Sequence, residues 1–288
     1  MTLQTERAEG SALDLTRCFL PEALTGVAPI RALTPEDRRR LNQIRAASYL
    51  HLFDTFEGLL SEVARARAAR SADDRDALAA LLRLDAFDHS ELFRSFAREL
   101  ASAFPVELRF VGRPADLERV LELASPLALL VMALHLKLVT QQHYLACVRG
   151  DEALEPRFVR LLKEHWTLEC GSTRGACASS LAIQRALAGA SPRRVPAALR
   201  DYRLIVFACD DVLARQAELD VATLERARGA ALPPGERAPV RSVEVAAHRK
   251  AFLTVGIVNA AFVYAMRSLG PAAPATLAGV VSALGNRR

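Results

Sequence analysis

The stretch TPEDRRRLNQIRAASYLHLFDTFEGLL, residues 34–60, contains the clearest helix signal of the chain. Thr34 can cap a helix, and Pro35 suits its first position. The two acids that follow place negative charge where the helix dipole favours it. Apolar residues then recur at near-helical spacing, which indicates one buried stripe. These residues are Leu41, Ile44, Ala47, Tyr49, Leu52, Phe56, Leu59 and Leu60. We therefore expect one long helix that begins at Pro35 and ends near residue 69.

Similar start and stop signals recur along the rest of the chain. The further helices that they predict cover residues 72–104, 114–148, 156–189, 196–226 and 243–269, and a short helix follows Pro274. We expect a break at Pro126, because proline inside a helix removes a backbone hydrogen bond. Residues 234–239 are rich in proline and glycine and predict a loop.

The composition favours helix over sheet. Aromatic residues make up 6% of the 288 residues, while alanine and leucine are abundant. Hydrophobic residues make up 51%, so the chain can bury one large core or two modest ones. We expect an all-α protein with an N-terminal arm, residues 1–33, and a single helical domain, residues 34–288. Pro21, Gly26 and Pro29 interrupt any helical period in the arm.

The charge and hydropathy patterns exclude two kinds of partner. The net charge of +5 comes mostly from arginines scattered among acids, whereas nucleic-acid binders gather basic residues on one face. The apolar segments 126–134 and 251–266 are shorter than the roughly 20 residues of a membrane span. We therefore expect no nucleic-acid and no membrane partner.

The cysteines and the N-terminal residues bear on the compartment. The chain has an odd number of cysteines and no Cys-x-x-Cys pair, which argues against a disulfide framework. The first thirty residues contain several acids and no continuous apolar stretch, unlike a secretory signal. These observations favour a cytoplasmic protein with reduced thiols.

Ionisable residues lie within the apolar stripes of the first four expected helical regions, where such groups are seldom buried without a partner. They are Glu57, His89, His135, Lys137, His165 and Glu169. His165 and Glu169 are four residues apart, so both side chains can converge on one point between helices. Inward carboxylate and imidazole groups from four helices are how ferritin-like bundles hold two metal ions. A lone histidine or glutamate in a helix is also commonly a core or surface group without any metal.

Several segments resemble the ferritin-like diiron oxygenases of the p-aminobenzoate N-oxygenase type, over roughly residues 34–190. The likeness lies in LNQI at 41–44 through Glu57, HSELF at 89–93, TQQHY at 140–144 and LLKEHW at 161–166, and residues 248–264 are similar to the closing helix of that family. The resemblance implies a ferritin-like helical bundle, with residues 34–190 as a four-helix core and residues 191–288 as additional capping helices.

The resemblance also implies a ligand set, which this chain keeps only in part. Such proteins use a Glu on the first helix, Glu-x-x-His on the second, a Glu on the third and His-x-x-x-Glu-x-x-His on the fourth. Four positions agree with that pattern, namely Glu57, His89, His165 and Glu169. Three positions depart from it, namely Ala86, Lys137 and Ser172.

The departures remove two carboxylates and add an ammonium group, so we do not expect an intact diiron centre. We hypothesise that Lys137 pairs with Glu57 or Glu169 and replaces the metal electrostatically. Alternatively, neighbouring groups such as Asp85 and His135 substitute for the missing ligands. Two histidines and one carboxylate would then suit a single iron or manganese ion.

These observations lead to two functional hypotheses. The first is a divergent relative of the diiron oxygenases with a lost or remodelled metal centre, which serves as a binding or accessory protein for a small molecule or a partner protein. The second is a metal-dependent oxidoreductase or oxygenase that acts on a small organic substrate. A homodimer would fit either hypothesis, because residues 251–266 offer more apolar surface than one side of a bundle readily covers.

Overall fold

The computed structural model describes residues 12–28, 30–84, 90–170 and 178–287, and these residues are almost all helical. Within these ranges there is no strand, only an isolated bridge between Cys18 and Leu154. The helices up to residue 148 are α1 (Glu22–Thr25), α2 (Pro35–Arg70), α3 (Ala72–Ala77), α4 (Ala79–Leu84), α5 (Ser90–Ala103), α6 (Ala115–Leu123), α7 (Pro126–Gln142) and the π-helical turn η1 (His143–Val148). The later ones are α8 (Pro156–Cys170), α9 (Ala178–Ala188), the 3₁₀ turn η2 (Pro192–Arg194), α10 (Val195–Arg228), α11 (Arg237–Arg249), the π-helical turn η3 (Lys250–Thr254), α12 (Val255–Val258), α13 (Ala260–Arg267) and α14 (Ala272–Asn286).

The first long helix begins and ends where the sequence predicts. The Thr34 hydroxyl accepts a hydrogen bond from the Asp37 N–H at 3.1 Å, and the Asp37 carboxylate accepts one from the Thr34 N–H at 3.1 Å. This capping box satisfies two backbone groups that would otherwise have no partner. The expected break at Pro126, the start of α8 at Pro156 and the long helix α10 are also confirmed.

Two expected helices are interrupted. The predicted helix over residues 72–104 divides at Leu78 into α3 and α4, and residues 85–89 lie outside the described ranges. The predicted helix over residues 243–269 begins earlier, at Arg237, and stops at Asn259. Asn259 takes a non-helical ψ of 128°, and its side chain accepts hydrogen bonds from the N–H groups of Ala261 and Phe262. An asparagine that caps a new helix explains this break, because its side chain replaces the backbone acceptors that are lost there.

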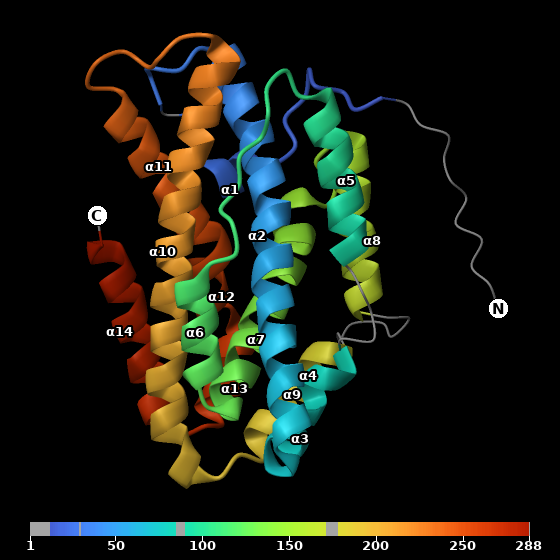
Figure 1. The fold of residues 1–288 in the computed structure, drawn as a ribbon, viewed down its shortest axis with the longest axis vertical. Helices are drawn as coiled ribbons and strands as arrows, with labels where there is room; N and C mark the ends of the chain where they lie inside the picture. Colours follow the sequence, from blue (N-terminus) through green and yellow to red (C-terminus); the bar gives the residue numbers. More distant parts are fainter. Residues whose placement is uncertain (1–11, 29, 85–89, 171–177, 288) are drawn as a thin grey trace, which may run out of the picture.

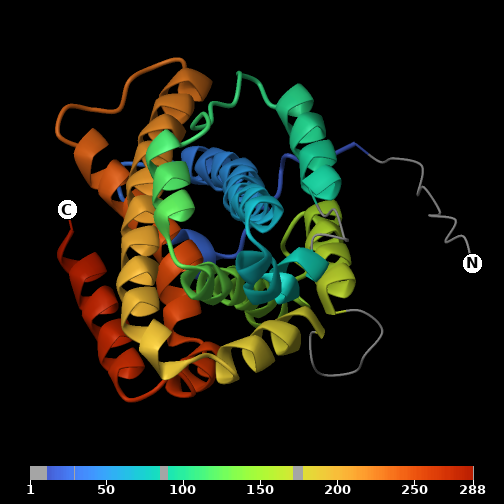
Figure 2. The same cartoon turned by 60° about the horizontal axis from the view of Figure 1, so that its bottom comes forward.

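The helices form a bundle in which α2, α7 and α10 pack against one another (Figure 1). On one flank α5 packs against α2 and α8, and on the other α11 and α14 pack against α10. With the bundle turned by 60°, α10 again lies on one side of α2, and α5 and α8 lie on the other (Figure 2). α10 buries residues along its whole length, from Val195 to Leu224. Helices that follow residue 190 therefore contribute to the centre of the bundle as well as to its outside.

Residues 12–28 and 30–33 lie against the body of the protein and are held there by α2. The Asn42 side chain accepts hydrogen bonds from the N–H groups of Phe19 and Leu20 at 2.7 and 3.1 Å, and donates one to the Leu20 carbonyl at 2.6 Å. Phe19 is fully buried, and its ring packs against those of Phe96 and Phe158. The arm thus anchors α5 and α8 to α2.

Most of the large apolar side chains of residues 251–266 are buried in the core of the protein. Phe252, Leu253, Phe262 and Met266 are each fully buried. Gly256 lets α12 lie close to α7, because a Cβ atom added there would be 2.3 Å from Nε2 of His135. Most of the apolar surface that favoured a dimer therefore lies in the core, and the homodimer stays a prediction. Within the described ranges, no helix combines the length and hydropathy that a membrane crossing needs.

Candidate functional site

A lysine lies between two glutamates where α2, α7 and α8 meet. The Lys137 ammonium is 3.2 Å from a carboxylate oxygen of Glu57, and it donates a hydrogen bond to a carboxylate oxygen of Glu169. The Glu169 side chain is 1% exposed, the Lys137 side chain 12% and the Glu57 side chain 20%. We call these three residues the lysine–carboxylate cluster. The contacts that the Lys137 hypothesis requires are present, and with both glutamates rather than one.

Burial and charge act in opposite directions within the lysine–carboxylate cluster. Burial disfavours the charge on Lys137, but the two carboxylates outweigh it and hold the pKa of Lys137 above its ordinary value. Burial raises the pKa of Glu169, and repulsion from Glu57 adds to this effect, while Lys137 opposes it. With all three groups ionised the cluster carries one excess negative charge, so its stability depends on the ammonium.

His165 lies one helical turn before Glu169 on α8 and is 2% exposed. Its ring stacks on Phe93 of α5, with ring centroids 4.6 Å apart and planes inclined by 24°. Stacking between an imidazole and an aromatic ring contributes to helix packing as well as to orientation of the imidazole. His165 therefore joins α5 to α8 beside the lysine–carboxylate cluster.

Other positions singled out in the sequence either lie elsewhere or cannot be placed. His89, Asp85, Ala86 and Ser172 are outside the described residues, so their part in a site stays a prediction. His135 is fully buried in a different contact set. Its Nδ1 atom pairs with the Tyr202 hydroxyl at 2.7 Å, and its Nε2 atom pairs with the Phe252 carbonyl at 2.9 Å.

These contacts make His135 unsuitable as a substitute metal ligand in this conformation, because both of its ring nitrogens are engaged. Burial lowers the pKa of His135 to about 4, so the ring is neutral near pH 7. A neutral ring that donates from Nε2 to the Phe252 carbonyl and accepts at Nδ1 satisfies both contacts. His135 is thus a core residue that links α7 to α10 and to the π-helical turn η3.

The lysine–carboxylate cluster does not fit a metal ion as it stands. Carboxylate oxygens bind transition metals at about 2.0–2.2 Å, so an ion shared by Glu57 and Glu169 would lie between their oxygens. The Lys137 ammonium holds that position and contacts both carboxylates. A metal ion would have to displace a buried cation that is already hydrogen-bonded.

A second buried charge cluster, which the sequence analysis does not identify, joins α2, α10 and α11. Asp220, Glu244 and His248 each offer a ligand atom, and these atoms lie within 4.8 Å of one another. The Arg45 guanidinium, however, donates hydrogen bonds to both carboxylate oxygens of Glu244, one of them at 2.9 Å. All four residues are at most 2% exposed. Burial raises the pKa of Glu244, and Arg45 opposes this shift.

The Asp220 carboxylate has a complete set of neighbouring donors. One oxygen accepts from the Ser48 hydroxyl at 2.5 Å and from the Gln216 amide at 2.8 Å. The other oxygen pairs with Nε2 of His248 at 2.7 Å. In both of these carboxylate clusters a basic side chain of the protein pairs with the acids. It is Lys137 in the lysine–carboxylate cluster and Arg45 in the second cluster. The spacing of four between Glu244 and His248 is a signal that could have identified this second cluster.

A buried histidine and a buried tyrosine pair where the π-helical turn η1 contacts α2. The Tyr49 hydroxyl is 2.9 Å from Nδ1 of His143, which is the first residue of the π-helical turn η1. Burial lowers the pKa of His143 to about 3 and raises that of Tyr49. Nε2 of His143 has no hydrogen-bond partner among the described groups. Both side chains are therefore neutral near pH 7.

Comparison of this chain with models of protein families, with curated proteins and with solved structures finds no match. The assignment of a family therefore rests on the residues of this chain alone. It is a proposal, which the geometry of the lysine–carboxylate cluster constrains.

Proposed function

We propose that this protein is a metal-independent binding or accessory protein, related to the ferritin-like diiron oxygenases, in which Lys137 takes the electrostatic place of a metal ion. The observation that carries the proposal is the contact of the Lys137 ammonium with both Glu57 and Glu169. An internal cation compensates the buried carboxylates at all times, whereas a metal centre would need them free for an exchangeable ion.

The second buried cluster supports the same interpretation. Arg45 pairs with both oxygens of Glu244, and each oxygen of Asp220 has a donor at 2.8 Å or less. A cation that entered this cluster would have to break a buried bidentate ion pair, which costs several kcal/mol, of order 3–5, when one partner is lost. Neither carboxylate cluster is thus arranged to take up a metal ion.

The alternative function is a metal-dependent oxidoreductase that acts on a small organic substrate. The favouring observation is the grouping of imidazole and carboxylate side chains, in Asp220, Glu244 and His248 and in the pair of His165 and Glu169. In that case metal binding would stabilise the protein by mass action, and chelation would destabilise it. The two functions therefore differ in a simple measurement.

The test is metal uptake by three proteins that are otherwise treated identically. Wild-type protein, Lys137→Met and the control Lys163→Met are incubated with Fe(II) under anaerobic conditions or with Mn(II), desalted and analysed for metal content. Lys163 is exposed on α8 and has the same charge as Lys137, so its variant controls for loss of a lysine. Thermal unfolding with and without EDTA is recorded alongside.

We expect no stoichiometric metal in the wild type or in Lys163→Met, and no effect of EDTA on the unfolding temperature. Lys137→Met should take up more metal than either, because Glu57 and Glu169 then lack their internal cation. One or two metal ions per wild-type chain, with a lower unfolding temperature in EDTA, would refute metal independence and favour the oxidoreductase.

A further inference from the structure

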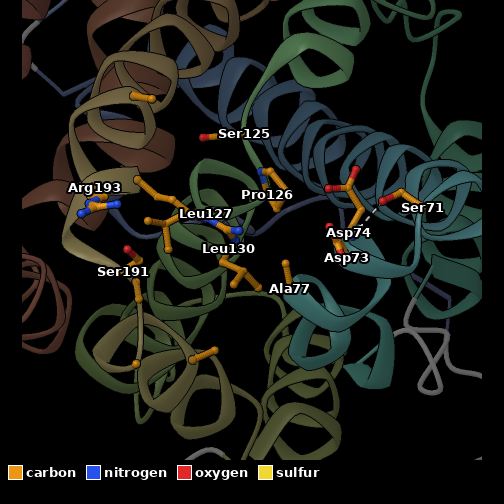
Figure 3. Close-up of a pocket in the computed structure, with 15 residues that line it drawn as sticks. Ser71, Asp73, Asp74, Ala77, Ser125, Pro126, Leu127, Leu130, Ser191 and Arg193 are labelled. Carbon is orange, nitrogen blue, oxygen red and sulfur yellow. Dashed lines mark hydrogen bonds between the residues drawn. The ribbon is translucent and has the colours of Figure 1, made fainter.

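A cleft of about 740 Å³ opens where the ends of several helices meet (Figure 3). Its walls come from the junction of α2 and α3, the start of α7, the end of α9, η2 and the start of α10. The volume lies within the range of small-molecule sites, about 300–1,000 Å³. Pro126 at the cleft precedes Lys137 by 11 residues of α7, or about 16 Å along the helix at 1.5 Å per residue. The cleft is therefore separate from the lysine–carboxylate cluster.

The middle of the cleft is apolar. Pro126, Leu127 and Leu130 come from the first turns of α7, and Ala186 and Ala190 come from α9 and the residues after it. In Figure 3 the side chains of Leu127 and Leu130 lie between Arg193 on one side and the acidic start of α3 on the other. This surface can take the hydrocarbon body of a ligand.

Charge in the cleft is uneven. Arg193 and Arg194 line one wall, and no described residue forms an ion pair with either guanidinium. On the opposite wall Asp74 is already paired with Nε of Arg67 at 2.9 Å. Asp73 is the remaining acid of the lining, so two arginines face one uncompensated carboxylate. The cleft therefore has an excess of positive charge that an anion would neutralise.

Two helix starts add to this positive field. α7 and the helical segment that begins at Pro192 both start at the cleft, and their N-cap residues, Ser125 and Ser191, make no side-chain capping hydrogen bond. The Ser125 hydroxyl oxygen is buried and has no partner among the described groups. A buried hydroxyl without a partner is unfavourable, so a ligand oxygen that reached this group would gain a hydrogen bond. Helix N-termini favour negative charge, and at α7 the Asp201 carboxylate, which accepts a hydrogen bond from the Ser125 N–H at 2.9 Å and pairs with Arg200, already supplies part of it.

We propose that this cleft binds a small amphipathic anion, a carboxylate or a phosphate monoester with an apolar body. The anionic group pairs with Arg193 and Arg194 near the start of α7, and the apolar body covers Leu127 and Leu130. The inference deepens the proposed function, because it names the class of ligand that a binding protein of this kind would take. Its biological role rests on that proposed function. Binding at the cleft itself does not depend on Lys137, which lies elsewhere in the bundle.

The test uses three probes that share a benzene ring: phenyl phosphate, benzoate and benzylamine. Each is titrated into the full-length protein by isothermal calorimetry at low and at high salt. The variants are the double substitution Arg193→Gln with Arg194→Gln, and Ala77→Phe, which fills the cleft without changing its charge. The control is Arg160→Gln, an exposed arginine on α8 that does not line the cleft.

We expect phenyl phosphate or benzoate to bind and benzylamine not to bind. The double arginine variant should weaken anion binding about tenfold or more, in line with the loss of charge-assisted hydrogen bonds. Ala77→Phe should weaken it as well, and Arg160→Gln should not change it. Binding of only one anion assigns the class, phosphate monoester or carboxylate.

Three outcomes would overturn the inference: no binding of either anion at millimolar concentration, equal binding of benzylamine, or anion binding that both the double arginine variant and Ala77→Phe leave unchanged. Circular dichroism of each variant shows whether it is folded. Metal uptake tests the role of Lys137 and does not depend on this titration, so failure of one proposal is distinguishable from failure of the other.

Discussion

Lys137 on α7 and Glu169 on α8 form an ion pair in which the carboxylate side chain is 1% exposed, and the same ammonium lies 3.2 Å from Glu57 on α2. One basic side chain thus links three helices of the bundle. Removal of one partner from a buried ion pair strongly destabilises a protein, because the remaining charge has no water to solvate it. The arrangement makes the stability of the fold depend on Lys137.

Substitution of Lys137 by methionine removes the charge and keeps most of the volume. We expect the free energy of unfolding at pH 7 to fall by about 3–5 kcal/mol, because Glu57 and Glu169 lose their shared cation. Urea unfolding measures this change, with Lys163→Met as the exposed control. A loss below about 0.5 kcal/mol, the range of ordinary surface substitutions, would mean that the ammonium compensates neither carboxylate.

Neutralising the whole lysine–carboxylate cluster should recover most of that loss. In a triple variant, Lys137→Met with Glu57→Gln and Glu169→Gln, no charge remains in this cluster, and replacement of buried ion pairs by neutral groups is often close to neutral in stability. We expect the triple variant to unfold within about 1–2 kcal/mol of the wild type in urea. If it is as unstable as Lys137→Met alone, packing around residue 137, rather than uncompensated charge, explains the single variant.

Acid should destabilise the protein through its buried neutral histidines. The folded-state pKa values of His135 and His143 are about 4 and about 3, below the unfolded value near 6.5. As the pH falls below 6.5 the unfolded chain binds protons that the folded chain does not, so stability is present above pH 6.5 and is lost towards the folded pKa. Each histidine should lower the free energy of unfolding by about 1 kcal/mol as the pH falls from 6 to 5.

The variant His143→Gln isolates this effect from the titration of carboxylates. Its free energy of unfolding should fall by about 1 kcal/mol less than that of the wild type between pH 6 and pH 5, because one depressed pKa is absent. Urea unfolding at both pH values gives the comparison. Equal losses in the two proteins would contradict the assignment of His143 as a buried neutral group.

Local signals in the sequence were sufficient for several helix starts and for one contact of the candidate site. The cap at Thr34 and the break at Pro126 depend on residues within one turn, and both are found in the structure. A pairing of Lys137 with Glu57 or Glu169 could be predicted from the sequence, because all three lie in apolar stripes, where a charge needs a partner. The structure shows contacts with both glutamates.

Contacts between distant segments could not be predicted in the same way. Arg45 and Glu244 are 199 residues apart, and only the packing of both α2 and α11 against α10 brings them together. The break at Asn259 depends on a capping hydrogen bond that competes with an apolar run of helical period. The cleft at the start of α7 gathers residues from three stretches of the chain, 71–77, 125–130 and 186–197, none of which carries a motif.

The close approach of α12 to α7 at Gly256 gives a final prediction with an internal control. A Cβ atom at Gly256 would lie 2.3 Å from Nε2 of His135 and 2.6 Å from a methyl group of Val139, so Gly256→Ala must push α12 away from α7 or break the bond from His135 to the Phe252 carbonyl. Overpacking of this kind costs about 1–3 kcal/mol. Gly279 on α14 has no atom within 4 Å of an added Cβ, so Gly279→Ala should leave the protein as stable or make it more stable by up to about 1 kcal/mol. Thermal and urea unfolding of the two variants provide the measurement. If Gly256→Ala is as stable as Gly279→Ala, then α12 does not approach α7 this closely, and the contacts of His135 would need to be reassigned.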